Sequence, residues 1–131
     1  MEPIILTFRI RGRQARAKLP ASLPQELSDA LENCLHWIPA PLSHMPGLCL
    51  CDENYIQRWT ERVPDRPLAR RMCRMLLLSG FLGERQPGVL AVPTHLLQTA
   101  GIERQAEMSL LEPGCILVQA RQPPRRKDLT R

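Results

Sequence analysis

The sequence lacks any apolar run long enough to cross a bilayer. Its longest apolar window, MLLLSGFL at residues 75–82, is far shorter than the roughly 18 residues that a membrane helix needs. The N-terminal stretch MEPIILTFRIRGRQ carries its positive charge after the apolar residues, which is the reverse of a signal peptide. We therefore expect a soluble intracellular protein with no membrane partner.

The recognisable motifs of enzymes are also missing. The chain has no glycine-rich phosphate loop and no G-x-S-x-G sequence, and its three histidines, His36, His44 and His95, have no acid at a catalytic spacing. We expect no enzymatic activity, no small-molecule substrate and no cofactor. His95, just after Pro93, is interpreted as a partly exposed polar position.

Five cysteines are present, but none forms a C-x-x-C pair, so a disulfide framework is disfavoured and reduced thiols are expected. The candidate ligands for a zinc site are Cys34, His36, His44, Cys49 and Cys51. Structural zinc sites usually use pairs spaced two to four residues apart, so the alternative is favoured: Cys49 and Cys51 are small apolar residues on one face of a strand.

The charge is informative because of where it lies. The net charge is +5, and the basic residues gather at the two ends of the chain. Residues 1–20 hold one acid, Glu2, against Arg9, Arg11, Arg13, Arg16 and Lys18. The tail 121–131 is Pro-rich and basic, and disorder is expected there. Such ends are often only solvated, but they are also where a polyanion could bind.

An internal repeat organises the rest. Pro20 and Pro93 each stand in an [LV]-P-x-x-L sequence, and PGLCLC at residues 46–51 matches PGCILV at residues 113–118. Each copy predicts a strand that runs into proline, a short helix, a further strand, a Pro-Gly turn and a last strand. A unit of this size cannot bury its own apolar faces, so two copies must interlock.

The local signals within each copy are specific. In the first, a strand over 8–19 is interrupted by Gly12, and Ser22 with Gln25 resembles a capping box for the helix that follows. In the second, the strand covers 88–92, and Gly101 stands where the end of a helix favours a positive φ.

Two helices are predicted between the copies. Asp52 caps the first, whose apolar stripe is Tyr55, Ile56, Trp59 and Val63. The second follows Pro64 and Asp65 and ends at Gly80, with an apolar side of Leu68, Met72, Met75 and Leu76. It also carries a row of arginines, which either binds phosphates or, the favoured interpretation, is solvated or pairs with carboxylates: Arg66, Arg70 and Arg74.

These features resemble a known family. The tandem unit resembles the SpoVT/AbrB swapped-hairpin domain, and the P-x-x-R-R-x-x-R sequence of Pro67, Arg70, Arg71 and Arg74, followed by GVLAVPTHLLQTAGI, resembles the MraZ family of bacterial transcriptional regulators. The resemblance covers roughly residues 4–118. It implies a ring-shaped homo-oligomer that binds repeated promoter elements in double-stranded DNA, in the cytoplasm and on the nucleoid.

The resemblance implies an α+β fold of tandem AbrB-like swapped-hairpin units forming one pseudo-symmetric domain, with helices between and beside the repeats. The first repeat is expected over residues 4–52, a helical linker over 53–80, the second repeat over 81–120 and the basic tail over 121–131.

The chain also departs from the family pattern. An Asp-x-x-x-Arg signature falls on Gly12 to Arg16, where the aspartate is absent, and on Arg85 to Val89, where both partners are absent. An aspartate at this spacing would hold the arginine, and its loss also removes a charge that repels phosphate. The expected DNA-binding residues are Arg9, Arg11, Arg13, Arg16, Lys18 and Arg85. The alternative is a divergent member that keeps the oligomeric scaffold and acts through protein contacts.

Overall fold

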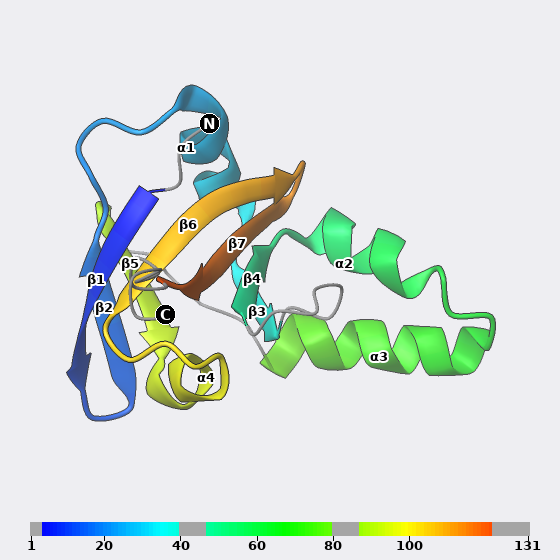
Figure 1. The fold of residues 1–131 in the computed structure, drawn as a ribbon. Helices are drawn as coiled ribbons and strands as arrows, with labels where there is room; N and C mark the ends of the chain where they lie inside the picture. Colours follow the sequence, from blue (N-terminus) through cyan, green and yellow to red (C-terminus); the bar gives the residue numbers. More distant parts are fainter. Residues whose placement is uncertain (1–3, 40–46, 80–86, 122–131) are drawn as a thin grey trace, which may run out of the picture.

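The computed structural model describes residues 4–39, 47–79 and 87–121, which form a mixed α+β fold (Figure 1). The strands are β1 (Ile4–Arg11), β2 (Gln14–Lys18), β3 (His36–Pro39), β4 (Gly47–Cys51), β5 (Val89–Pro93), β6 (Gln105–Glu112) and β7 (Cys115–Ala120). The helices are α1 (Gln25–Asn33), α2 (Glu53–Thr60), α3 (Arg66–Ser79) and α4 (Thr94–Thr99).

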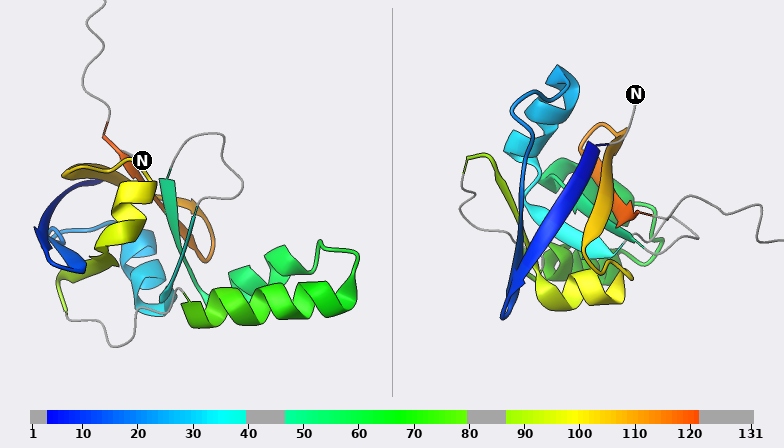
Figure 2. Two further views of the ribbon diagram at one scale, coloured as in Figure 1. Left: turned by 90° about the horizontal axis from the view of Figure 1, so that it is seen from below. Right: turned by 60° about the vertical axis from the view of Figure 1, so that its left-hand side comes forward.

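The seven strands form one antiparallel sheet in the order β3-β4-β7-β6-β1-β2-β5. Its two edge strands approach one another. Nε1 of Trp37 in β3 donates a hydrogen bond to the carbonyl oxygen of Ala91 in β5 at 3.0 Å. Trp37 is buried at 2% exposure, whereas Ala91 is only partly buried. The described sheet is therefore nearly closed around its core, as Figure 2 shows.

The main core fills the inside of this curved sheet. On β1 and β2 every second side chain points inward, and Leu6 and Phe8 are buried there while their neighbours along β1 face out. Helix α1 adds Leu27 and Leu31 to the same cluster, and α4 adds Leu97. The period of two along the strands thus decides which side of the sheet is apolar and which is free to carry charge.

In the sheet, the adjacent pairs β3-β4 and β1-β2 from the first part of the chain alternate with β7-β6 and β5 from the last part. β1 pairs with β6, β2 with β5, and β4 with β7. In the β2–β5 pair, Ala17 lies opposite Leu90. These two residues are as far apart in the sequence as Pro20 and Pro93. Neither part has a complete sheet alone, so each buries its apolar face against the other.

The junction from strand to helix at Pro93 is as predicted. β5 ends at Pro93, α4 begins at Thr94, and Gly101 after the helix has a φ of 74°. The predicted strand over 8–19 is instead a hairpin, because Gly12, with a φ of 62°, turns the chain between β1 and β2.

The predicted capping box of Ser22 and Gln25 is wrong. Helix α1 begins at Gln25 behind Pro24, and no side chain caps it. Pro24 has a φ of −54° and a ψ of 141°, and its carbonyl oxygen accepts a hydrogen bond from the Ser28 amide at 2.9 Å. The fixed φ of this second proline therefore sets the start of the helix, which leaves Ser22 outside it.

Helices α2 and α3 form a hairpin that extends away from the sheet (Figure 1). Asp52 caps α2 as predicted, since Oδ1 accepts a hydrogen bond from the Tyr55 amide at 2.7 Å. Tyr55 and Ile56 are buried in a second core cluster, together with Ile38 of β3 and residues of β4 and β7. This cluster holds the base of the helical hairpin on the sheet.

The predicted apolar side of α3 is wrong in part. Leu68 and Met75 are 43% and 62% exposed. The side that packs inward begins at the buried Ala69 and continues through the partly buried Cys73 and Leu76. These positions are spaced i, i+4 and i+7, so they form a stripe next to the expected one on the helix surface. The prediction missed this stripe because the hydrophobicity of the small Ala69 does not distinguish it from a surface residue.

We expect Trp37→Phe to lower the free energy of unfolding by about 1–2 kcal/mol, because the aromatic ring stays but the partly buried carbonyl of Ala91 loses its donor. Urea denaturation followed by far-UV circular dichroism measures the change. Trp59→Phe in α2, where the indole is only partly buried, is the control and should cost less. Equal losses would mean that the bond between the edge strands contributes nothing.

Candidate nucleic-acid interface

The hairpin of β1 and β2 gathers positive charge on the outer side of the sheet. Arg9 of β1 and Arg16 of β2 lie directly opposite one another, and Arg11 lies opposite Gln14. Lys18 follows on the same side, opposite Val89 of β5. All these positions alternate with the buried residues of the main core, so their side chains must face outward.

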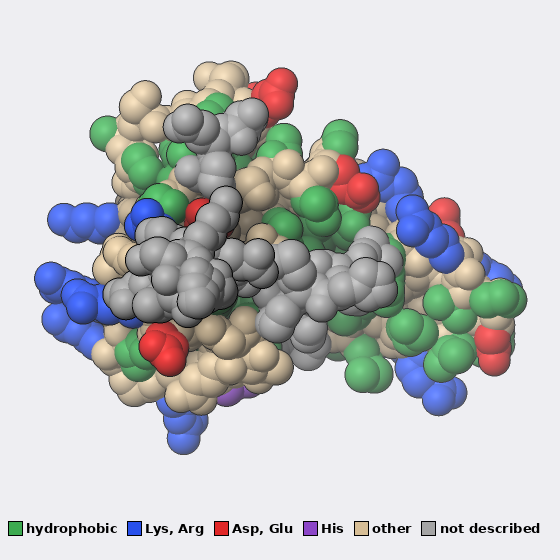
Figure 3. All heavy atoms as spheres, in the orientation of Figure 1, with side chains coloured by type: hydrophobic (Ala, Val, Ile, Leu, Met, Phe, Trp, Pro, Cys, Tyr) green, Lys and Arg blue, Asp and Glu red, His purple; other side chains and the backbone are tan. Residues whose placement is uncertain are grey.

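The turn of the hairpin adds Arg13 next to Gly12. All five basic residues are exposed, and the five together are called the basic face below: Arg9, Arg11, Arg13, Arg16 and Lys18. Figure 3 shows lysine and arginine side chains projecting from the flank of the molecule where β1 and β2 lie in Figure 1. The structure thus brings together five of the six residues expected to bind DNA. The sixth, Arg85, lies outside the described residues.

The charge of the basic face is not neutralised by carboxylates of the described chain. Within the ranges 4–39, 47–79 and 87–121, none of its five side chains forms an ion pair, and Arg16 only donates a 3.5 Å hydrogen bond to Oε1 of Gln14. Glu107 of β6 lies on the same side of the sheet, but opposite Ile5, four positions along β1 from Arg9. Like charges directly opposite one another destabilise a sheet, so an anion bound between Arg9 and Arg16 would relieve a repulsion.

The tip of this hairpin is fastened to α4. Oγ1 of Thr94 donates a hydrogen bond to the carbonyl oxygen of Gly12 at 2.9 Å, and the amide of Thr94 donates one to the carbonyl of Arg13, also at 2.9 Å. Two bonds to consecutive carbonyls hold the turn against the body. The basic face is therefore presented on a braced ribbon, which lowers the entropy that binding would cost.

At the first position where the family resemblance leads us to expect an aspartate, the local backbone conformation favours glycine. Gly12 occupies that position with a φ of 62°, where a side chain is strained, and no atom lies within 4 Å of where its Cβ would be. Arg16 is thus left without an acid at this spacing. Val89, where the same resemblance leads us to expect an arginine, is a half-buried residue at the start of β5.

The other arginines lie elsewhere. Arg66, Arg70 and Arg74 are exposed on α3, in the helical hairpin at the far side of the molecule from β1 and β2 (Figure 1). Arg66 donates a 3.3 Å hydrogen bond to the carbonyl of Glu61. This row is separate from the basic face.

The residues of the zinc alternative are divided. Cys34 belongs to the main core, whereas Cys49 and Cys51 are buried in the second cluster and His44 lies outside the described residues. Over the described ranges, no three or more His, Cys, Asp or Glu residues are arranged to hold a metal ion. Cys49 and Cys51 are buried on one side of β4, as the apolar interpretation predicted.

Sequence reasoning missed a thiol cluster. Cys115 at the start of β7 lies opposite Cys51, with the two Sγ atoms 3.7 Å apart and both side chains fully buried. Hydrogen bonding to Cys115, with burial, raises the pKa of both Cys49 and Cys51. The same hydrogen bonds, from Cys49 first and Cys51 second, lower the pKa of Cys115 against the effect of burial. The sequence holds no signal for this contact, which depends on the register in which β4 and β7 pair.

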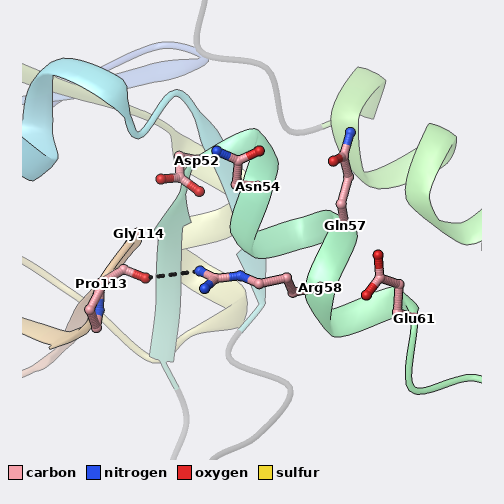
Figure 4. Close-up of a pocket in the computed structure, with 7 residues that line it drawn as sticks. All are labelled: Asp52, Asn54, Gln57, Arg58, Glu61, Pro113 and Gly114. Atoms are coloured by element: carbon pink, nitrogen blue, oxygen red, sulfur yellow. Dashed lines mark hydrogen bonds between the residues drawn. The ribbon is translucent and has the colours of Figure 1, made fainter.

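An open hollow of about 350 Å³ lies beside these thiols, between α2 and the turn that joins β6 to β7 (Figure 4). Asp52 and Arg58 fasten its two sides together. Oδ1 of Asp52 accepts a hydrogen bond from the Tyr55 amide, and the Asp52 amide donates one to the Gly114 carbonyl at 3.0 Å. The Asp52 carboxylate also lies so close to Gly114 that a Cβ at that residue would clash with it. Arg58 donates a 3.4 Å hydrogen bond to the Pro113 carbonyl. These contacts of Asp52 and Arg58 join α2 to the turn, whereas the carboxylate of Glu61, which also lines the hollow, takes part in none of them.

None of the helices in the described ranges is both long enough and apolar enough to cross a membrane.

Comparison with protein-family models, with curated proteins and with solved structures found no match for this chain.

We expect Arg9→Thr to raise the free energy of unfolding by about 0.5 kcal/mol at low salt, because it removes the repulsion across the pair with Arg16. The gain should vanish in 0.5 M salt, where about 4 Å of screening length remains. Thermal unfolding at both salt concentrations measures it.

The matched control is Lys18→Thr, which introduces the same side chain opposite the uncharged Val89. It should show no salt-dependent gain. If both variants respond to salt alike, the repulsion across β1 and β2 is not a local one.

Proposed function

We propose that this protein is a DNA-binding transcriptional regulator similar to the MraZ family, acting as a homo-oligomer on repeated promoter elements at the nucleoid. The observation that carries the proposal is the basic face, where Arg9 and Arg16 lie directly opposite one another. Neither forms an ion pair with a carboxylate of the described residues. A sheet tolerates such a pair at a cost in stability, and phosphate binding is the function that offsets it.

The shape of the basic face suits duplex DNA. The major groove admits a two-stranded antiparallel ribbon. β1 and β2 form an antiparallel hairpin held at its tip by Thr94, and β2 also pairs with β5, so the hairpin would meet DNA with its outer side. On this proposal all five residues of the basic face, Arg13 and Arg16 among them, bind phosphates along the ribbon, and one or two of the five also reach base edges.

The arrangement of the strands supports tandem swapped-hairpin units as the scaffold. If two equivalent copies are related by a two-fold axis between β2 and β5, the axis passes between two directly opposed residues that hold equivalent positions in the two copies. The sequence separation of these two residues must then equal the repeat offset. Ala17 opposite Leu90 meets this requirement with the offset of Pro20 and Pro93. The strands that carry the matched PGLCLC and PGCILV segments, β4 and β7, also pair with one another.

Assembly would multiply weak contacts. Each subunit would carry one basic face, and several faces held in one ring would engage successive repeats of a promoter, so that avidity exceeds the affinity of any single face. No enzymatic activity is proposed.

A second function rests on the absent aspartate at Gly12 and on the exposed apolar residues of α3, of which Leu68 and Met75 are examples. On this alternative the chain keeps an oligomeric scaffold and binds proteins instead of DNA. Assembly in solution without retention of any duplex would favour it.

We expect Arg13→Ala with Arg16→Ala to weaken binding to a duplex of short repeats by at least tenfold. The slope of log affinity against log salt should also fall by about two, because each phosphate contact contributes roughly one. Fluorescence anisotropy over a salt series measures both quantities. Loss of affinity without a change of slope would show that the two residues do not contact phosphate.

The matched control is Arg70→Ala with Arg74→Ala, two exposed arginines of α3. It removes the same net charge from the far end of the molecule, so it should change affinity much less. Equal losses from both double variants would mean that net charge, and not the basic face, drives binding. Wild-type protein that binds no duplex at low salt would overturn the proposal.

A further inference from the structure

Four of the five cysteines meet at one place. Cys49, Cys51 and Cys115 are buried members of the second core cluster, and the partly buried Cys73 of α3 packs against it. The fifth, Cys34, belongs to the main core. The described structure contains all five as thiols with no disulfide. The proposed DNA contacts use none of them, so this cluster raises a separate question of function.

The register of β4 and β7 singles out one pair. Cys51 lies directly opposite Cys115, whereas Cys49 lies opposite Leu117 and reaches Cys115 only diagonally. The Asp52 amide donates to the Gly114 carbonyl, so the ladder hydrogen bonds flank the Cys51–Cys115 pair and do not join it. Such non-hydrogen-bonded pairs have Cα atoms about 4.5 Å apart, within the range that disulfides span.

The sulfur atoms already face one another. Their Sγ atoms are 3.7 Å apart, so a small rotation about each χ1 brings them to bonding distance without a change of register. A neighbouring thiol favours the ionised nucleophile that the chemistry needs, because hydrogen bonds from Cys49 and Cys51 lower the pKa of Cys115.

The pair also lies next to an opening. Cys51 is the last residue of β4 and Cys115 the first of β7, and their chain neighbours Asp52 and Gly114 line the open hollow beside α2. Both thiols are fully buried, which excludes bulky reagents. A small neutral oxidant needs only brief fraying of these strand ends to reach them.

We propose that Cys51 and Cys115 are an oxidisable dithiol pair that a hydroperoxide converts to a cross-strand disulfide. The inference goes beyond the proposed function and does not depend on it.

The reaction is balanced with one peroxide. The Cys115 thiolate attacks a peroxide oxygen, the O–O bond breaks, and Cys115 becomes a sulfenic acid while the leaving oxygen takes up a proton as water or alcohol. The Cys51 sulfur then attacks the Cys115 sulfur, the S–O bond breaks, and the hydroxide leaves with the Cys51 proton as water. Two thiols lose two electrons, and the peroxide gains them.

The bond would join two distant parts of the chain. Cys51 and Cys115 are 64 residues apart in sequence and belong to the two copies proposed above. Closing so large a loop restricts the unfolded chain, so oxidation should raise the melting temperature by roughly 10 °C. The second core at the base of α2 and α3 would be held most directly.

The test treats the full-length protein with hydrogen peroxide under native conditions, blocks the remaining thiols with iodoacetamide after denaturation, and maps the peptides without reduction. We expect a Cys51–Cys115 linked peptide, three alkylated cysteines, a raised melting temperature, and reversal of all three by dithiothreitol. Alkylation of both Cys51 and Cys115, or oxidation confined to the partly exposed Cys73, would overturn the inference.

Single substitutions supply the controls. Cys51→Ala and Cys115→Ala should each abolish the linked peptide and the thermal shift, while Cys34→Ala, which removes a thiol of the main core, should keep both. If a Cys49–Cys115 link forms in the wild type, the register argument fails. DNA binding is not a readout here, so failure of this inference leaves the proposed function intact, and the reverse also holds.

Discussion

Antiparallel hydrogen bonding between early and late strands is the interaction on which this structure depends. Because β1 pairs with β6, β2 with β5 and β4 with β7, the two halves of the chain share one sheet and one main core. The pairing gives every strand an inner and an outer side. It also places charged residues of β1 and β2 outside while Leu6 and Phe8 fill the interior. The position of every candidate functional group follows from this arrangement.

The two places where chemistry is concentrated are opposite in character. The basic face lies exposed on the outer side of the β1–β2 hairpin, where the charges of Arg9 and Arg16 repel one another. Thr94 holds the tip of this hairpin through hydrogen bonds to backbone carbonyls. The thiol cluster lies in a buried second core, where desolvation favours neutral groups. The first is suited to an anionic surface of large extent, and the second only to a small reagent. Their separation lets each be tested without disturbing the other.

Local signals in the sequence predicted much of the fold. Proline before α4, the positive φ at Gly101 and the cap by Asp52 are each decided by neighbouring residues, and all are confirmed. The start of α1 was mispredicted because two signals competed, and the fixed φ of Pro24 overrode the hydroxyl of Ser22. The buried side of α3 was mispredicted because the burial of the small Ala69 depends on what packs against it and not on its own hydrophobicity.

The candidate site divides in the same way. Alternation along β1 and β2 was sufficient to bring Arg9 and Arg16 to one side, but their direct opposition depends on where Gly12 turns the chain. The contact between Cys51 and Cys115 depends on the register of strands distant in sequence, which no local pattern reports. Neither the braced tip of the hairpin nor the hollow beside α2 has a signature in composition or spacing.

The interleaved order of the strands has a consequence for biosynthesis. Ile4 pairs with Met108, so β1, which leaves the ribosome well before β6, must wait for β6 before it can complete its hydrogen bonds. Until then the apolar side of the β1–β2 hairpin stays uncovered, and contacts of such long sequence separation form slowly. The like-charged arginines on its other side would meanwhile repel a second nascent hairpin, so the charge proposed for DNA binding also protects the unfinished chain from pairing with its copies.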